Sequence, residues 1–196
     1  MKRSNFFAMF FMPIFVFTLL FSSKVSEASD FKFNHETFKE KYNASVEKWA
    51  QTIKAQNPDI TEEDNEEFIV YLSIEDYEFS PTSAGVPQYV FNFELNGSPG
   101  LLVPCDKNTG RVKNVTLFFT LSDDPNIQGF NVSIMGSMLM SVMPNLSYNN
   151  ANTIISDLFN RAINASNHMT EKVYNGVKCQ MGLSVPRSMF VVSPAF

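Results

Sequence analysis

The chain has 196 residues, two cysteines and a formal net charge of −5 at pH 7. This length predicts a single domain. The negative charge argues against a nucleic-acid partner and against electrostatic binding to an anionic membrane.

The chain begins with a predicted signal peptide. Lys2 and Arg3 precede an almost wholly apolar run over residues 6–21, and a small-x-small motif ends at Ala28. This pattern predicts cleavage between Ala28 and Ser29. An uncleaved anchor helix is the alternative, but the apolar run is short for a bilayer span of about 20 residues.

We therefore expect residues 1–28 to be removed and residues 29–196 to form a single exported domain, secreted or periplasmic. No cysteine lies at the cleavage site, so a lipoprotein is not expected. No later run is apolar enough to span a membrane after signal cleavage. Because residues 1–28 carry a net charge of +2, the remaining chain carries −7.

The first predicted element is a helix that begins after an Asn34 N-cap, with Phe33 and Phe38 at the staple positions. It ends near Pro58, because the residue before proline avoids the α region. One helical face is apolar and predicts packing against a sheet; its residues are Phe38, Tyr42, Val46, Trp49 and Ile53.

An acidic stretch over residues 62–67 follows, which we interpret as a solvated loop with a short helical turn capped by Thr61. Alternating apolar residues then predict a strand from about Phe68 to Asp76. Residues 78–87 are rich in Ser, Pro, Thr and Gly and predict a long loop that is able to carry a binding function.

Residues 89–121 predict three strands joined by two tight turns. Apolar and polar residues alternate from Tyr89 to Leu95 and again from Val115 to Leu121, which indicates an antiparallel sheet with one buried face. Val90 and Phe118 break the alternation on the other face, where they are candidates for contacting a partner or ligand.

Two further helices are predicted. Residues 122–125 have the pattern of a helix start, and residues 127–143 fit both a helix of period four and an alternating strand. Their length and four methionines favour a buried helix. Ser147 then caps a helix with an apolar stripe from Ala151 to Ala162.

The C-terminal part predicts three more strands, with a type I′ hairpin at Asn175-Gly176. The predicted order is α-ββββ-αα-βββ. It indicates an α+β domain in which an antiparallel sheet of about seven strands packs three helices on one face.

Cys105 and Cys179 each lie on a predicted strand, in phase with its apolar residues. Two interpretations remain open. An oxidising compartment would allow a disulfide, which the chain-entropy model values at about 4 kcal/mol. Alternatively, both are buried free thiols, because cysteine packs as a small hydrophobe.

The turn from Asp106 to Gly110 has the D-x-N-x-G spacing of the front of a calcium loop, but Arg111, Val112 and Lys113 follow where an acidic ligand is needed. We interpret it as a hairpin turn. It resembles the Asp-x-x-Thr-Gly turn of small exported bacterial domains such as the PepSY type, a resemblance that is confined to this turn and implies no function.

The residues that would indicate an enzyme are scattered. His35 and His168 have no neighbours at metal-ligand spacing, so both are expected at the surface, and no catalytic site, cofactor or metal is predicted. The motif Asn-x-Ser/Thr occurs at Asn43, Asn96, Asn114, Asn131, Asn145 and Asn164. These asparagines are glycan acceptors only in a eukaryotic secretory pathway.

Three hypotheses follow. The leading one is an exported non-enzymatic module that binds protein, peptide or cell-envelope material through its sheet or loops. The second is a secreted hydrolase whose catalytic residues are dispersed in the sequence. The third is an assembly partner of an envelope complex, which uses an exposed sheet edge.

Overall fold

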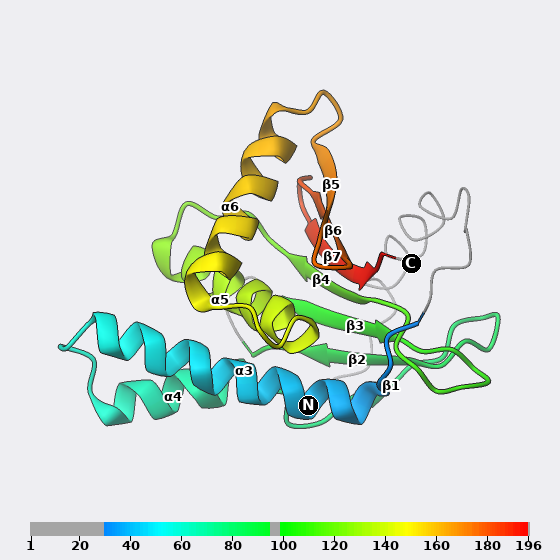
Figure 1. Ribbon diagram of the computed structural model, residues 1–196, viewed down its shortest axis with the longest axis horizontal. Helices are drawn as coiled ribbons and strands as arrows, with labels where there is room; N and C mark the ends of the chain where they lie inside the picture. The colour runs from blue at the N-terminus through cyan, green and yellow to red at the C-terminus, as the bar shows by residue number, and fades with distance from the viewer. Residues whose placement is uncertain (1–29, 95–98, 196) are drawn as a thin grey trace, which may run out of the picture.

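The computed structural model describes residues 30–94 and 99–195 (Figure 1). The predicted signal peptide, with its cleavage site between Ala28 and Ser29, and the turn at Asn96 lie outside the described residues. The elements in chain order are α3 (His35–Gln56), α4 (Glu62–Leu72), β1 (Glu78–Phe79), β2 (Gln88–Asn92), β3 (Gly100–Pro104), β4 (Val115–Phe119), α5 (Pro125–Val142), α6 (Tyr148–Asn164), β5 (Met169–Tyr174), β6 (Val177–Gly182) and β7 (Ser188–Pro194).

The seven strands form one antiparallel sheet in the order β1-β2-β3-β4-β7-β6-β5. The C-terminal strand β7 is inserted between β4 and β6, so it joins the two halves of the sheet. Figure 1 shows α3, α4, α5 and α6 gathered on one side of the strands. The predicted α+β class with a seven-stranded antiparallel sheet is therefore confirmed.

The helices begin where the sequence places their caps. Asn34 accepts a hydrogen bond from the Thr37 N–H at 2.9 Å, and the rings of Phe33 and Phe38 stack beside it. Asp124 and Ser147 cap α5 and α6 in the same way. Residues 127–143, which were compatible with helix or strand, belong almost entirely to α5.

The predicted strand from Phe68 to Asp76 is wrong. Its residues up to Leu72 belong to α4, and residues 73–76 form no strand. Thr61 and Asp64 form a complete capping box at its start, which satisfies two backbone N–H groups that would otherwise lack partners. The first strand is instead β1, within the predicted loop over residues 78–87. The sheet keeps seven strands, but residues 30–94 and 99–195 form four helices rather than three, and the additional helix α4 packs against α3 and α5.

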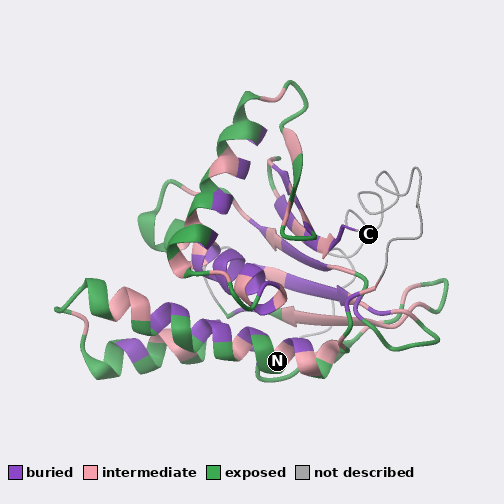
Figure 2. Ribbon diagram, viewed as in Figure 1, coloured by how far each residue is buried: buried purple, intermediate pink, exposed green. Residues whose placement is uncertain are grey.

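The core lies between the sheet and the helices (Figure 2). Helices α3 and α5 cross closely at Trp49 and Gly136. A Cβ atom placed on Gly136 would lie 1.9 Å from the Trp49 ring, so only glycine fits there. The Trp49 Nε1–H donates to Ser133 Oγ at 3.0 Å, which fixes the indole against α5.

Candidate functional site: the outer face of the sheet

The face of the sheet that is turned away from the helices carries a group of apolar side chains, which we call the outer apolar surface. It consists of Val90, Leu102, Phe118, Met189 and Val191, contributed by β2, β3, β4 and β7. None of the five belongs to the core cluster on the helix side. They therefore form a second, separate apolar surface.

Strand register brings these residues together from distant parts of the sequence. One row runs from Val90 through Leu102 and Thr116 to Val191. The neighbouring row runs from Gly100 through Phe118 and Met189 to Gly182. Residues directly opposite each other on one face lie about 5 Å apart. The outer apolar surface is therefore continuous across four strands.

The side chains of this surface differ in accessibility. Leu102 and Met189 are 7% and 8% exposed, whereas Val90, Phe118 and Val191 are half-buried. Glycines flank the Phe118–Met189 pair, and a Cβ atom on Gly182 would lie 3.4 Å from Met189 Cγ. The Asn92 side chain lies close to Gly100 in the same way, since a Cβ atom there would be 2.9 Å from Asn92 Oδ1.

The prediction that Val90 and Phe118 lie opposite the helix-packed face is confirmed by their register, while Leu102, Met189 and Val191 were missed. A signal for them exists. Leu102 lies between Leu101 and Val103, and Met189 begins the run Met-Phe-Val-Val. Continuous apolar runs indicate strands with two apolar faces.

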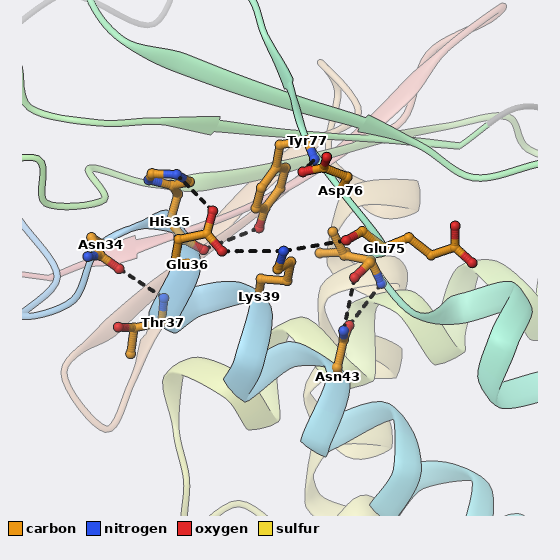
Figure 3. A network of polar contacts seen from close by, with 10 residues as sticks. Asn34, His35, Glu36, Thr37, Lys39, Asn43, Glu75, Asp76 and Tyr77 are labelled. Carbon is orange, nitrogen blue, oxygen red and sulfur yellow. Dashed lines mark hydrogen bonds and ion pairs between the residues drawn. The ribbon is translucent and has the colours of Figure 1, made fainter.

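A second group of interest surrounds His35, the first residue of α3 (Figure 3). Its ring stacks on Tyr89 with centroids 3.5 Å apart and meets the edge of Tyr77. His35 Nε2 lies 3.2 Å from Glu36 Oε1, and Lys39 Nζ lies 3.3 Å from Glu36 Oε2. His35 was expected at the surface, but its side chain is only 21% exposed.

These contacts give His35 a positioning role. Burial lowers the pKa of His35, and the Glu36 carboxylate opposes that shift. Burial also raises the pKa of Tyr77, whose hydroxyl donates to the His35 carbonyl at 3.5 Å. Nearby, Asn43 donates to the Ile74 carbonyl and accepts from the Ile74 N–H. Together they hold the start of α3 against β2 and the connection between α4 and β1.

His168 lies in the connection between α6 and β5, exposed as expected. Its φ of 53° is in the left-handed region, and its carbonyl accepts from the Leu183 N–H at 2.9 Å. The residue therefore shapes a turn. Within residues 30–94 and 99–195, no group of three His, Cys, Asp or Glu side chains is placed to hold a metal ion.

Cys105 and Cys179 are buried, as expected, and both thiols are free. Cys105 follows β3 and Cys179 lies on β6, so β4 and β7 separate them. Three interstrand spacings amount to about 14 Å, beyond the roughly 7 Å limit for Cα atoms in a disulfide. The disulfide interpretation is wrong for this fold.

Burial raises the pKa of Cys105 to about 11 and that of Cys179 to about 12. The thiolate is the nucleophilic form of cysteine, and a reactive cysteine has a lowered pKa. Neither thiol meets this requirement, so packing explains both residues.

The Asp106–Gly110 turn is confirmed as a hairpin turn. Asp106 Oδ1 accepts from the N–H groups of Asn108 and Thr109 and from the Thr109 hydroxyl, and Gly110 has a φ of 68°. These hydrogen bonds lower the pKa of Asp106 to about 2. The carboxylate oxygen that a cation would need is thus already engaged within the turn.

The asparagines of the Asn-x-Ser/Thr motifs differ in access. Asn43 is bound to Ile74, and Asn131 is 6% exposed and donates to the Thr120 carbonyl. Asn145 and Asn164 are exposed, and Asn114 is half-buried. Asn96 lies outside the described residues.

The chain matches no protein-family model, no curated protein and no solved structure. Among the residues that the structure describes, no helix is both long and apolar enough to cross a membrane.

Proposed function

We propose that the protein is an exported binding module that receives an apolar segment of a protein or peptide partner on the outer apolar surface. The observation that carries this proposal is the group of Val90, Leu102, Phe118, Met189 and Val191 in two neighbouring rows on the side of the sheet opposite the helices. Contiguous apolar patches on soluble proteins mark interaction sites.

The export part of the proposal is supported by the predicted signal peptide over residues 1–28. The binding part is supported by strand pairing, because a seven-stranded sheet holds its side chains in a fixed array. A partner that docks on such an array meets a pre-organised surface, so little conformational entropy is lost on binding.

The test compares three versions of the mature protein as bait in its native extracellular or periplasmic fraction. The first is wild type, the second is Phe118→Lys on the outer apolar surface, and the third is Ile163→Lys on α6. Ile163 is 58% exposed, so its replacement adds the same charge on another face. Circular dichroism verifies that all three are folded.

We expect to capture a partner with wild type and with Ile163→Lys but not with Phe118→Lys. The same partner should bind purified wild type directly. Burying an uncompensated lysine at a docked apolar surface is costly. Val191→Lys provides a second variant on the same surface if Phe118→Lys does not fold. Equal binding by all folded variants would remove the outer apolar surface from the proposal.

A further inference from the structure

The sheet has two edges of different character. At one edge, β1 pairs with β2 over two residues only. At the other edge, β5 spans six residues and pairs with β6 along its whole length. A short edge strand is a common way to prevent pairing with another chain, and β5 is not shortened in this way.

The turn that joins β5 to β6 determines which backbone groups of β5 face outward. Asn175 and Gly176 have φ values of 48° and 77°, as in a two-residue type I′ turn. In such a hairpin Tyr174 bonds to Val177, and hydrogen bonding then alternates along the strand. The bond from the Leu183 N–H to the His168 carbonyl continues this alternation.

The backbone N–H and C=O groups of Glu171 and Val173 therefore point away from β6. Within residues 30–94 and 99–195, no strand pairs with this side of β5. The Met169 N–H is bound to Asn167 Oδ1, so the open edge begins after it. Glu171, Lys172 and Val173 are all exposed, Val173 at 48%.

We propose that an extended segment of a partner protein adds to β5 as an eighth strand, with a basic side chain opposite Glu171 and apolar side chains opposite Met169 and Val173. These three residues share the outer face of the sheet. The Glu171 carboxylate accepts a hydrogen bond from Gln180 Nε2 at 2.9 Å, and the residue is exposed, so the carboxylate is accessible to a cation. Opposite charges directly across a strand pair are favourable.

Charge also argues against a second copy of this chain as the occupant. In an antiparallel pair of two β5 strands with their outer faces aligned, two registers share the greatest overlap, and one of them places Glu171 opposite Glu171. The other places Lys172 opposite Lys172. Like charges directly opposite each other destabilise a strand pair.

This inference rests on the proposed binding function but uses a different surface, so the two can fail separately. Strand addition depends on the outward backbone groups of Glu171 and Val173. Docking on the outer apolar surface depends on Phe118 and its neighbours. A variant at either place tests one surface and leaves the other unchanged.

The probe is the peptide Thr-Val-Thr-Lys-Thr-Val-Thr, and its control is Thr-Val-Thr-Glu-Thr-Val-Thr. Each sequence is symmetric about its centre, so either strand direction presents the same pattern. Binding is measured by titration, and amide hydrogen exchange locates it. We expect roughly fivefold tighter binding of the lysine peptide and slower exchange at the amides of Glu171 and Val173.

Four variants, two of them controls, test the geometry. Val173→Pro removes one outward N–H without removing a bond to β6, so it should weaken binding at least as much as the change of peptide does. Val173→Thr keeps that N–H and should bind as wild type does. Glu171→Lys should reverse the preference between the two peptides, and Phe118→Lys should leave it unchanged.

The inference is overturned if Glu171→Lys leaves the preference unchanged, or if the peptide protects amides away from β5. It is also overturned if raising the protein concentration, without peptide, slows exchange at the amides of Glu171 and Val173. That result would indicate that the β5 strands of two copies of this chain pair with each other. If Val173→Pro does not fold, the preference reversal in Glu171→Lys still decides the outcome.

Discussion

Gly136 is the residue whose replacement has the most predictable consequence. Its missing Cβ is the space that the Trp49 ring occupies, so Gly136→Ala requires the indole or α5 to move. Overpacking of this kind costs about 1–3 kcal/mol. We expect a loss of that size in the free energy of unfolding, measured by urea denaturation.

Gly129, in the same helix, is the matched control. It is exposed, and a Cβ atom there meets nothing within 4 Å. Gly129→Ala should stabilise the protein by up to about 1 kcal/mol, because alanine is the better helix former. Equal effects at both positions would contradict the proposed crossing of α3 and α5.

Asp157 makes the stability depend on pH. The Tyr174 hydroxyl donates to it at 2.6 Å, and Arg161 and Lys172 lie at 2.9 and 3.1 Å. The Tyr174 hydrogen bond leads these contacts in lowering the pKa of Asp157 to about 2. Because the folded pKa is below the unfolded pKa of about 4, this stabilisation is complete above pH 4 and is lost as the pH falls toward 2.

Asp157→Asn should therefore lower the midpoint of thermal unfolding at pH 7, and the difference from wild type should shrink between pH 4 and pH 2. The pKa of Asp106 is lowered to about the same value. Asp106 is present in wild type and in Asp157→Asn, so it contributes equally to the pH dependence of both proteins. Asp123→Asn, at an exposed carboxylate outside this network, should show no such convergence. A difference that is constant from pH 7 to pH 2 would contradict the role of Asp157.

Among the elements, α4 is a helix whose sequence also carries the alternation typical of a strand. Phe68, Val70, Leu72 and Ile74 alternate, but Val70 is 62% exposed while Leu72 is buried. The buried side of α4 follows a helical spacing through Asn65, Phe68, Ile69 and Leu72. The capping signal at Thr61 and Asp64 was the more informative part of the sequence.

Thr61→Ala tests this cap. The variant loses the hydrogen bond that the Thr61 hydroxyl accepts from the Asp64 N–H at 3.1 Å, and we expect a loss of about 1 kcal/mol. Thr52→Ala in α3 is the control, because its hydroxyl only donates to the Lys48 carbonyl within the helix. That change should stay within about 0.5 kcal/mol. Urea denaturation measures both, and equal losses would argue against the cap.

Other elements were accessible from local patterns. The cap at Asn34, the apolar stripe of α3 and the Asn175-Gly176 turn each depend on residues close in sequence, and all three are confirmed. The strand β1 was not accessible, because two residues carry no periodicity. The outer apolar surface was foreseen only at Val90 and Phe118, since its other members depend on which strands become neighbours.

At the scale of the whole molecule, strand order decides the state of the cysteines. β4 and β7 lie between Cys105 and Cys179, so the folded protein holds two reduced thiols. A thiol-alkylating reagent should add no label to the native protein and two labels in denaturant without reductant. Cys105→Ala should take one label in denaturant. Labelling that requires prior reduction would contradict the separation of the two residues.

The crossing of Trp49 and Gly136 also limits how the length of this chain can vary among related sequences. One residue inserted into α5 before Gly136 would rotate the glycine by about 100° and place another side chain against the indole. Insertions between β1 and β2 meet no such contact at Gly85, where a Cβ atom has nothing within 4 Å. We expect homologous chains to differ in length at that connection and to keep the number of residues between Pro125 and Gly136.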